Sequence, residues 1–518
     1  MQRGKSSINW LTAICACALA IFNADLCRAQ QNNTDTTPAL RLTTSLVILD
    51  VTVMDKSGHP VTTGLNKDDF LITEEKQPQK IFSFEAPQEH VASGDEESSL
   101  SKAPATILVL DQLNDSVDEF TLLQKAAHDY LAAQPATLPT PAEVLVATNT
   151  SLEMVQGYTR SRDDLIFAVD HVPPANAFKF AKSDFDGERA RQSIDNLKQI
   201  AVQNRGVPGR KNVLWLGRGG PSLSRALYGT MLDGWAQYVH AAANLLVEAR
   251  VSLFVVFPQL KVISSHGVTL QQTDRDANYG NNGPFTGDVN FALFAKETGG
   301  SLFFNRNDLS TEIEDAVTLG SNYYTLSYRP SQSAIDGKFR SVHVTTRNPD
   351  LHVITKIGYF SLPKNASDPQ QQIAIDMYDA AATTLPMHAL ELSVSDVVRQ
   401  SDMRTVHFVL HVKPSHLGWV AAQNDIKQAN LVMGMLSLSR GKKILASRFQ
   451  TVELHSSAAD PDAVLEEVRF KLTAHIPPKT QMVRIVLRVT ENGRTGTADL
   501  DEKMLAQAPE VPAGSAQK

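Results

Sequence analysis

Short apolar runs alternate with amphipathic helical patterns through the middle of the chain. A short unbroken apolar run is typical of a strand buried on both faces, whereas apolar residues three and four positions apart indicate one face of a helix. Their alternation predicts a mostly parallel sheet with helices on both faces, a doubly wound α/β fold. The predicted strands are "TILVL" (106–110), "EVLVAT" (143–148), "NVLWLG" (212–217), "VSLFVVF" (251–257), "GSLFF" (300–304) and "YYTLSYR" (323–329). The predicted helices run from Val117 to Ala133, Arg162 to Val169, Gly187 to Asn204, Gly234 to Ala249 and Leu309 to Leu319.

On both sides of this region the pattern changes to alternation with period two, which indicates half-buried strands joined by turns. Before it, the segment "LVILDVTVMDKSGHPV" and the hairpin-like "DDFLITEEKQPQKIFSFEA" predict a small Ig-like β-domain. After it, "RTVHFVLHVKP", "NLVMGMLSLSRG", "LEEVRFKLTAHIP" and "QMVRIVLRVTENG" predict a β-sandwich. The expected limits are 40–90 for the small β-domain, 103–360 for the α/β domain, 385–505 for the β-sandwich and 506–518 for a disordered tail.

The first 29 residues have the form of an export signal. Arg3 and Lys5 precede an apolar run, and "LCRAQ" places a cleavage site near Ala29. The alternative, a membrane anchor, is disfavoured because Asn23 and Asp25 interrupt the run before the roughly 20 residues that a span needs. We therefore expect an exported protein, whether periplasmic, associated with the outer envelope or secreted, with no stable transmembrane span after cleavage.

The positions of the cysteines and the net charge exclude thiolate-based sites and disfavour nucleic acid as a partner. Cys15, Cys17 and Cys27 all lie inside the predicted signal, so the mature chain would contain no thiolate for catalysis or for metal binding. The net charge is −7, and no run of Lys and Arg forms the basic stripe that follows a phosphate backbone. We therefore do not expect nucleic acid as a partner.

Four segments give the chain a resemblance to a known family. They are "VTVMDKSGHPVTTGLNKDDFLITEEKQPQKIFSF", "VPGRKNVLWLGRGGP", "AKETGGSLFFNRNDLSTEIEDA" and "YYTLSYRPSQSAIDGKFRSVHVTTR". Over residues 40–360 the chain resembles the von Willebrand factor A-related family of acidobacterial type. The resemblance implies a von Willebrand A domain preceded by a small β-domain, in an exported protein.

The resemblance also implies a place for a metal, because von Willebrand A domains often hold Mg²⁺ or Mn²⁺ with D-x-S-x-S after the first strand, a threonine and a later aspartate. Asp111 matches the first position, but Leu113 replaces the first serine and Asp115 the second. The later aspartate is replaced by Gly217, with Arg218 beside it. A hard cation needs oxygen ligands, so we predict that the site is degenerate and that no cofactor is bound.

Two interpretations of the acidic residues stay open at this stage. Asp111, Asp115 and Thr159, with Asn114 nearby, could compose a variant site for Mg²⁺ or Mn²⁺. We favour the other interpretation, in which Asp111 is a turn or helix-cap residue that accepts hydrogen bonds from backbone amides. Thr159 is also ambiguous, because Thr159 or Ser161 could cap a helix that begins in "YTRSRDDL".

Other motifs give little support for catalysis. The sequence contains neither a G-x-S-x-G elbow nor an H-E-x-x-H helix. His407 and His411 share one face of a predicted strand, but we see no third ligand near them. The loop from Asp274 begins like a calcium loop but has Tyr279 where glycine is required, and "GRGGPSLS" lacks the Lys-Ser/Thr pair of a P-loop.

These observations predict an exported, non-enzymatic protein-interaction module. We expect an unknown protein partner to bind at Asp111, Asn114, Asp115 and Arg218, through the loops after Asp111, Gly217 and Pro258. Arg218 could donate a bidentate hydrogen bond to a partner's carboxylate. The alternatives are an exported hydrolase that uses the acids near Asp111 and a structural component of an envelope assembly.

Overall fold

The structure is a computed structural model of the whole chain. It describes residues 46–90, 103–174, 186–221, 235–258, 291–303, 308–331, 336–361, 369–402, 404–421, 426–440, 442–455 and 467–512. The predicted export signal lies outside these residues. In the part of the chain that is described, no helix combines the length and the apolar character needed to cross a bilayer.

The central domain is built on a six-stranded sheet in the order β10-β9-β8-β5-β6-β7. All neighbouring strands are parallel except β6 and β7. Counted along the chain, this order is 3-2-1-4-5-6 read from the β7 edge, which is a doubly wound order. The strands are β5 (Ala105–Asp111), β6 (Thr137–Ala147), β7 (Leu152–Ser161), β8 (Lys211–Leu216), β9 (Val251–Val256) and β10 (Leu302–Phe303).

Helices cover both faces of this sheet because successive strand residues point to opposite sides. On β5, Ile107 and Val109 join one apolar core, and Leu108 and Leu110 join the other. The first core takes side chains from α4, α6 and α7, and the second from α2, α3 and α8. The helices are α2 (Val117–Ala132), α3 (Arg162–Asp170), α4 (Asp186–Gln203), α6 (Trp235–Glu248), α7 (Phe291–Glu297) and α8 (Leu309–Ser321). The predicted mixed α/β domain with a mostly parallel sheet is thus confirmed, while the antiparallel strand β7 and helix α7 were not predicted.

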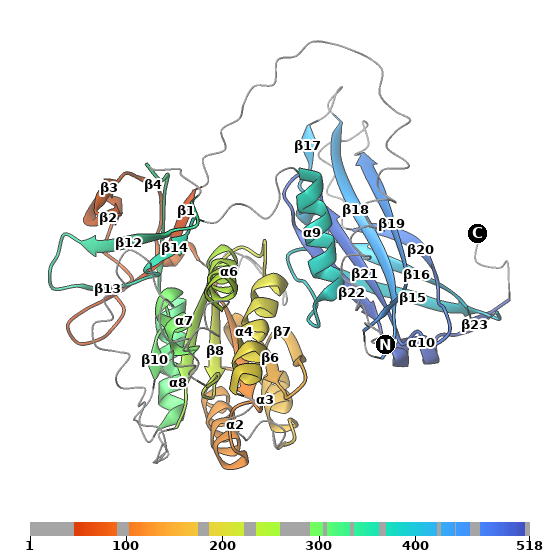
Figure 1. Cartoon of the computed structure of the whole chain (residues 1–518), viewed down its shortest axis with the longest axis horizontal. Helices are drawn as coiled ribbons and strands as arrows, with labels where there is room; N and C mark the ends of the chain where they lie inside the picture. Colours follow the sequence, from red (N-terminus) through yellow and green to blue (C-terminus); the bar gives the residue numbers. More distant parts are fainter. Residues whose placement is uncertain are drawn as a thin grey trace, which may run out of the picture. The chain divides into compact units, whose positions relative to one another are not determined.

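One predicted strand of the central sheet lies elsewhere. The segment "YYTLSYR" forms β11 (Tyr324–Tyr328), which pairs with β1 and β4 in another sheet and not with β10. Strands β12, β13 and β14 follow β11 into the same β-domain, and in Figure 1 they lie among the red strands from the beginning of the chain. The prediction that residues 324–360 belong to the α/β domain was therefore wrong, since those residues complete the N-terminal β-domain.

The N-terminal β-domain consists of two four-stranded sheets around one apolar core. Leu49 and Val51 from the beginning of the chain pack there with Leu326 and Val344, so the domain is formed by two distant segments. Its Ig-like class stays a prediction. The sheets are β13 (His352–Ile354)-β1 (Val47–Met54)-β11-β4 (Ile81–Glu85) and β14 (Gly358–Phe360)-β12 (Phe339–Thr346)-β2 (Phe70–Glu74)-β3 (Gln77–Gln79).

The C-terminal domain also has two sheets, which enclose a core that includes Phe408 and Leu410 from one sheet and Leu431 and Ile485 from the other. Helix α9 (Pro369–Ala382) precedes it in the chain. One sheet is β20 (Val468–His475)-β16 (Thr405–Val412)-β15 (Leu392–Gln400)-β23 (Glu510–Val511). The other is β17 (Val420–Ala421)-β18 (Lys427–Leu438)-β21 (Met482–Val489)-β22 (Thr495–Leu500), with β19 (Ile444–His455) paired to β18.

The expectation of a disordered tail from residue 506 was wrong in part. Helix α10 (Glu502–Gln507) extends into this segment, and β23 pairs in parallel with β15 at Arg399 and Gln400. Asp501 caps α10 by accepting a hydrogen bond from the backbone N–H of Met504. A Pro/Ala-rich composition suggested disorder, but this pairing with a sheet edge orders the segment as far as residue 512.

Candidate functional site

The candidate site lies where β5 and β8 end side by side. In doubly wound sheets, ligands bind outside the carboxyl ends of the strands, at the point where the strand order reverses. Here that point lies between β5, the first strand along the chain, and β8, the fourth. Asp111 is the last residue of β5, and Gly217 follows directly after β8.

Asp111 is fully buried, and both of its carboxylate oxygens accept hydrogen bonds. Oδ1 accepts from the backbone N–H groups of Leu113 (3.1 Å) and Asn114 (3.0 Å). Oδ2 accepts from the indole Nε1–H of Trp215 (2.8 Å) and from the backbone N–H of Gly219 (2.9 Å). The side-chain Nδ2 of Asn114 lies 3.2 and 3.1 Å from the two oxygens. A carboxylate has about four acceptor positions, so those of Asp111 are filled by N–H donors.

The environment of Asp111 has opposing effects on its charge. Burial raises the pKa of this carboxyl, and the hydrogen bonds from Trp215 and Asn114 lower it again in part. Because the donors come from the turn after β5, from β8 and from the turn after β8, one carboxylate connects three segments. This role matches the turn-residue interpretation that the sequence favoured.

Gly217 stands where the metal-site pattern of von Willebrand A domains has an aspartate. The structure gives a steric reason why no side chain fits at this position. Its φ is +145°, which side chains rarely adopt. A Cβ atom here would lie 2.4 Å from Cβ of Asp111 and 2.4 Å from Oδ2 of Asp115. Any side chain at this position would collide with the two acids.

Asp115 is also buried but is only half satisfied. Its Oδ1 accepts a hydrogen bond from the backbone N–H of Arg218 at 3.1 Å, while Oδ2 has no partner among the described residues. Burial, and then the charge of Asp111, raise the pKa of Asp115 well above its usual value. A buried carboxyl of this kind avoids an unpaired charge by keeping its proton.

Arg218 contacts a carboxylate that the sequence analysis did not name. Its Nη2 donates to Oε1 of Glu119, whose Oε2 accepts from the backbone N–H and the hydroxyl of Ser116, both at 2.9 Å. Burial alone would raise the pKa of Glu119, but the hydrogen bonds from Ser116 and Arg218 outweigh it and lower the pKa. The side chain of Arg218 is 34% exposed, so it remains in contact with solvent at the rim of the site.

Glu119 could have been found from the sequence, since "SVDE" has the S-x-x-E form of a capping box at the start of α2. Trp215 gave no such signal. Its indole is fully buried within the apolar run of β8, and only the arrangement of neighbouring strands brings its N–H to Asp111.

The residues of this site do not fit a Mg²⁺ or Mn²⁺ ion of the family's kind. The oxygens of Asp111 face N–H donors, Leu113 supplies no oxygen, and Gly217 has no side chain. Among the described residues of the site, two buried oxygens have no hydrogen-bond partner, Oδ1 of Asn114 and Oδ2 of Asp115. Mg²⁺ usually keeps several waters and binds through one or two carboxylates, and here the carboxylate of Asp111 already accepts N–H donors. Within the described residues, no group of three or more His, Cys, Asp or Glu side chains is placed to hold a metal.

Thr159 does not belong to this site, and the prediction that grouped it with Asp111 and Asp115 was wrong. In the register of the sheet, Asp111 pairs with Ala147, which pairs in turn with Leu152. Thr159 instead pairs with Ala142, toward the amino ends of the parallel strands. Because β7 runs antiparallel to β6, its last residues point away from the carboxyl ends of the parallel strands. Ser161 caps α3 instead, as the alternative interpretation proposed.

Several other predicted features lie apart from the site or outside the described residues. The calcium-like loop from Asp274 falls in 259–290, which also holds the loop after Pro258, and most of the loop after Gly217 falls in 222–234. His407 and His411 lie on one face of β16, but each contacts partners of its own. Nδ1 of His407 lies 2.9 Å from Oγ1 of Thr473, and Nδ1 of His411 lies 2.9 Å from a carboxylate oxygen of Glu467.

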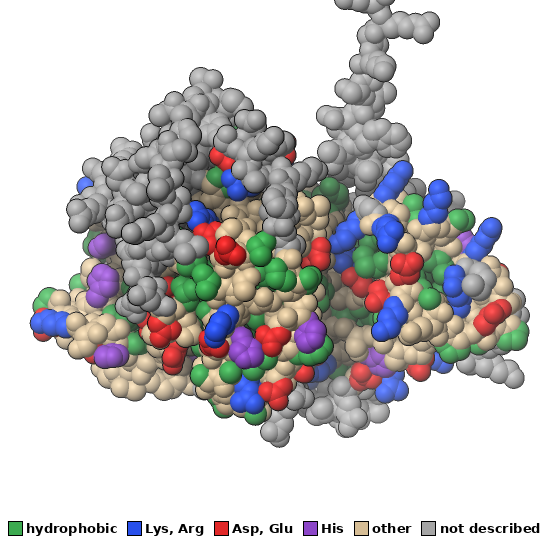
Figure 2. All heavy atoms as spheres, turned by 90° about the horizontal axis from the view of Figure 1, so that it is seen from below, with side chains coloured by type: hydrophobic (Ala, Val, Ile, Leu, Met, Phe, Trp, Pro, Cys, Tyr) green, Lys and Arg blue, Asp and Glu red, His purple; other side chains and the backbone are tan. Residues whose placement is uncertain are grey.

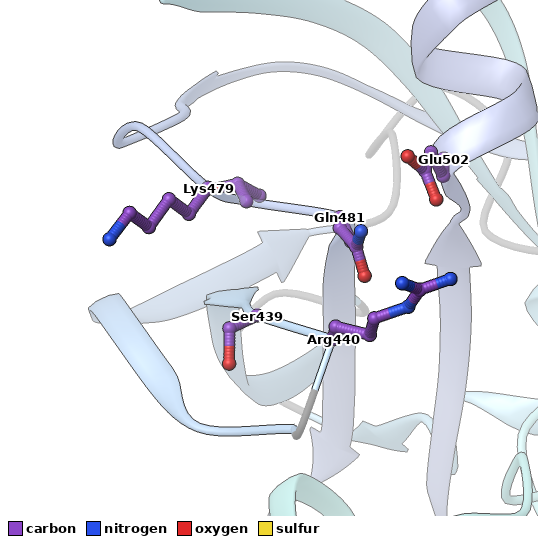
Figure 3. Close-up of a pocket in the computed structure, with 6 residues that line it drawn as sticks. Ser439, Arg440, Lys479, Gln481 and Glu502 are labelled. Atoms are coloured by element: carbon purple, nitrogen blue, oxygen red, sulfur yellow. The ribbon is translucent and has the colours of Figure 1, made fainter.

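On the face in Figure 2, acidic and basic side chains are mixed over much of the surface, and several Lys and Arg side chains lie along the upper part of the right-hand side. An open hollow of the C-terminal domain is lined by Ser439, Arg440, Lys479, Thr480, Gln481 and Glu502. In Figure 3 the ammonium group of Lys479 points away from Gln481 and Glu502, so the two basic side chains of the hollow do not converge on one ligand position.

Replacing Asp111 with Asn should destabilise the protein by ~3 kcal/mol, because the amide NH₂ would face N–H donors that need an acceptor. Urea unfolding followed by tryptophan fluorescence measures the loss. Asp118→Asn is the matched control, since Asp118 is exposed in the first turn of α2. Equal stability of the Asp111→Asn protein and the wild type would contradict the anchoring role.

Asp115→Asn should behave differently. With its pKa raised in the folded state, Asp115 holds a proton there that the unfolded chain has released, so its effect on stability becomes more unfavourable as pH rises above 3.8. Asn cannot ionise, and the variant should therefore lose less stability than the wild type as the pH rises above 3.8. Urea unfolding across this range tests the sign, and identical pH profiles would show that Asp115 does not hold the extra proton.

Comparisons with known proteins give one structural similarity and no match in sequence. No family model matches the chain, and no curated protein matches it in sequence. Among solved structures it is similar to one described as the crystal structure of the SpRpn10 VWA domain, with 9% identity and a TM-score of 0.22. That similarity covers 42% of this chain and 97% of the other. It is too weak to support an argument, so the mixed α/β class rests on the strand order.

Proposed function

We propose that this chain is an exported protein whose α/β domain acts as a non-enzymatic, protein-interaction module of von Willebrand A type with a degenerate metal site. The observation that supports this most is the filled acceptor set of Asp111. A carboxylate saturated by N–H donors is neither an open metal ligand nor a free base, but it fixes the loops around it in one geometry. A fixed loop surface at the carboxyl ends of the strands is suited to binding.

The partner would contact the rim of this site through Arg218. The backbone N–H of Arg218 is held by Asp115, and its Nη2 is held by Glu119, so the guanidinium is positioned before binding. Positioning in advance reduces the entropy lost on association. The exposed part of the guanidinium can donate to a carboxylate on the partner, which would replace the contact that a metal ion makes in other domains of this type.

A hydrolase that uses Asp111 and Asp115 is the less favoured alternative. Acid–base catalysis by two carboxylates needs one of them free to accept a proton. The acceptor positions of Asp111 are occupied, and burial favours the protonated form of Asp115.

A structural role in an envelope assembly is a further alternative, and a stable complex in membrane fractions would favour it.

Export can be tested directly. Expression of the full chain in a bacterial host should give a product that begins near Gln30, because the apolar run and the small residues before it direct cleavage near Ala29. Intact mass and N-terminal sequencing identify the first residue. A product that retains Met1 in the cytosol would contradict export.

Capture of a partner from an envelope extract in the presence of EDTA should fall about tenfold or more in Arg218→Ala, since a charge-assisted hydrogen bond contributes roughly 1.5–3 kcal/mol. Arg448→Ala is the control, because Arg448 is exposed on β19 of the C-terminal domain. Glu119→Gln should weaken capture as well, since it removes the carboxylate that holds Arg218 in position before binding. Unchanged capture in Arg218→Ala, or capture that requires a divalent metal, would overturn the proposal.

A further inference from the structure

Three side chains of the C-terminal domain form a relay that the sequence analysis did not detect. They are Ser395 on β15, His411 on β16 and Glu467 directly before β20. The three strands are neighbours in one sheet, in the order β20-β16-β15. Sequence separations of 16 and 56 residues hide the group from any motif search, although the strand pairing brings it together.

The distances are those of a nucleophile, a base and an orienting acid. Oγ of Ser395 lies 2.7 Å from Nε2 of His411, and Nδ1 of His411 lies 2.9 Å from Oε1 of Glu467. With Glu467 ionised, Nδ1–H donates to the carboxylate and Nε2 is left as the acceptor for the serine hydroxyl. Serine hydrolases use this constellation on unrelated folds, where it is identified by geometry and not by chain order.

The charge of Glu467 suits this role. Hydrogen bonds from Arg469 and from His411 lower the pKa of its carboxyl, so it is ionised at neutral pH. Arg469 donates from Nε to Oε2 of Glu467 at 2.7 Å, which leaves Oε1 for His411. The His411 side chain is 16% exposed and that of Glu467 33%, so the imidazole is held in place while solvent still reaches the group.

The backbone at Ser395 is irregular in a way that favours reactivity. Ser395 pairs with Val409 and Val398 pairs with His407, so Asp396 and Val397 together stand opposite one residue of β16. Asp396 has φ +50°, which is uncommon for a residue with a side chain. Bulges are over-represented beside active sites, and Asp396 and Val397 have no paired residue on β16, which makes their amides candidate donors to a developing oxyanion.

One neighbour opposes the reaction. Oδ2 of Asp396 lies 3.0 Å from Oγ of Ser395 and accepts the same hydroxyl proton that His411 would take. Its negative charge also disfavours an oxyanion nearby. Asp396 therefore restrains the serine, and its removal should increase reactivity.

We propose that Ser395, His411 and Glu467 form an esterase site for small carboxylic esters. Oγ of Ser395 forms a bond to the ester carbonyl carbon as its proton passes to Nε2 of His411. The proton then passes to the leaving alcohol as the carbon–oxygen bond breaks, which leaves an acyl-serine. Water repeats the two steps: it attacks the acyl carbon, gives its proton to His411, and releases the carboxylic acid as Ser395 regains its hydrogen. Glu467 acts as a positioning residue that fixes the tautomer of His411.

The first test is covalent labelling of the full chain with a fluorophosphonate probe, followed by peptide mass spectrometry. The expected result is one label on Ser395, none in Ser395→Ala, and release of p-nitrophenol from p-nitrophenyl acetate that falls ~100-fold or more in Ser395→Ala and in His411→Ala. Ser393→Ala is the matched control, because Ser393 is an exposed serine on the same strand. Circular dichroism confirms that each variant is folded.

Two further variants distinguish catalysis from a surface hydrogen-bond network. Asp396→Asn should label faster than the wild type. Glu467→Gln should lower kcat more than it raises KM, because it disturbs His411 and not the binding of the ester. The proposal is overturned if the wild type is not labelled at Ser395, if Ser393 is labelled equally, or if ester hydrolysis persists in Ser395→Ala. Because this site lies in another domain, its failure would leave the role of Arg218 untouched.

Discussion

The central domain depends on one buried carboxylate at the point where the strand order of its sheet reverses, between β5 and β8. Asp111 accepts hydrogen bonds from the turn after β5, from Trp215 and from Gly219, and these contacts hold the ends of two neighbouring strands and the turns that follow them. A buried charge without such donors would cost several kcal/mol. The N–H groups that converge on Asp111 are therefore required for the stability of the carboxyl ends of β5 and β8. The buried position of Asp111 also explains why Gly217 has no side chain.

Much of the architecture could be predicted from the sequence, because apolar periodicity reports burial along a strand or helix. It does not report which sheet a strand joins, and β11 pairs with β1 and β4 although it follows α8 directly in the chain. The site was predictable where adjacent residues decide it, as with Asp111 and Asn114. It was not predictable where distant strands meet, as with the indole of Trp215. Thr159 was misplaced because its distance from Asp111 depends on the antiparallel direction of β7.

The two candidate sites lie in different domains and differ in how far their ionisable side chains are buried. At the switch point of the α/β domain the carboxylates are buried and hydrogen-bonded or protonated, an arrangement that stabilises geometry and leaves Arg218 at the rim. On the C-terminal sheet, Ser395, His411 and Glu467 are partly exposed and carry a relay in which a proton can move. Both arrangements follow from strand pairing, since each aligns side chains from segments far apart in the sequence.

Titration calorimetry with Mn²⁺ tests the central claim about Asp111 most directly. The full chain, freed of metal with EDTA and dialysed, would be titrated beside an Asp111→Ala variant, with Mg²⁺ and Ca²⁺ in parallel runs. The account predicts that no binding heat depends on Asp111. Its oxygens already accept hydrogen bonds from the backbone N–H groups of Leu113, Asn114 and Gly219 and from the indole of Trp215, and the side-chain amide of Asn114 also contacts them. Stoichiometric Mn²⁺ binding that disappears in the variant would contradict it.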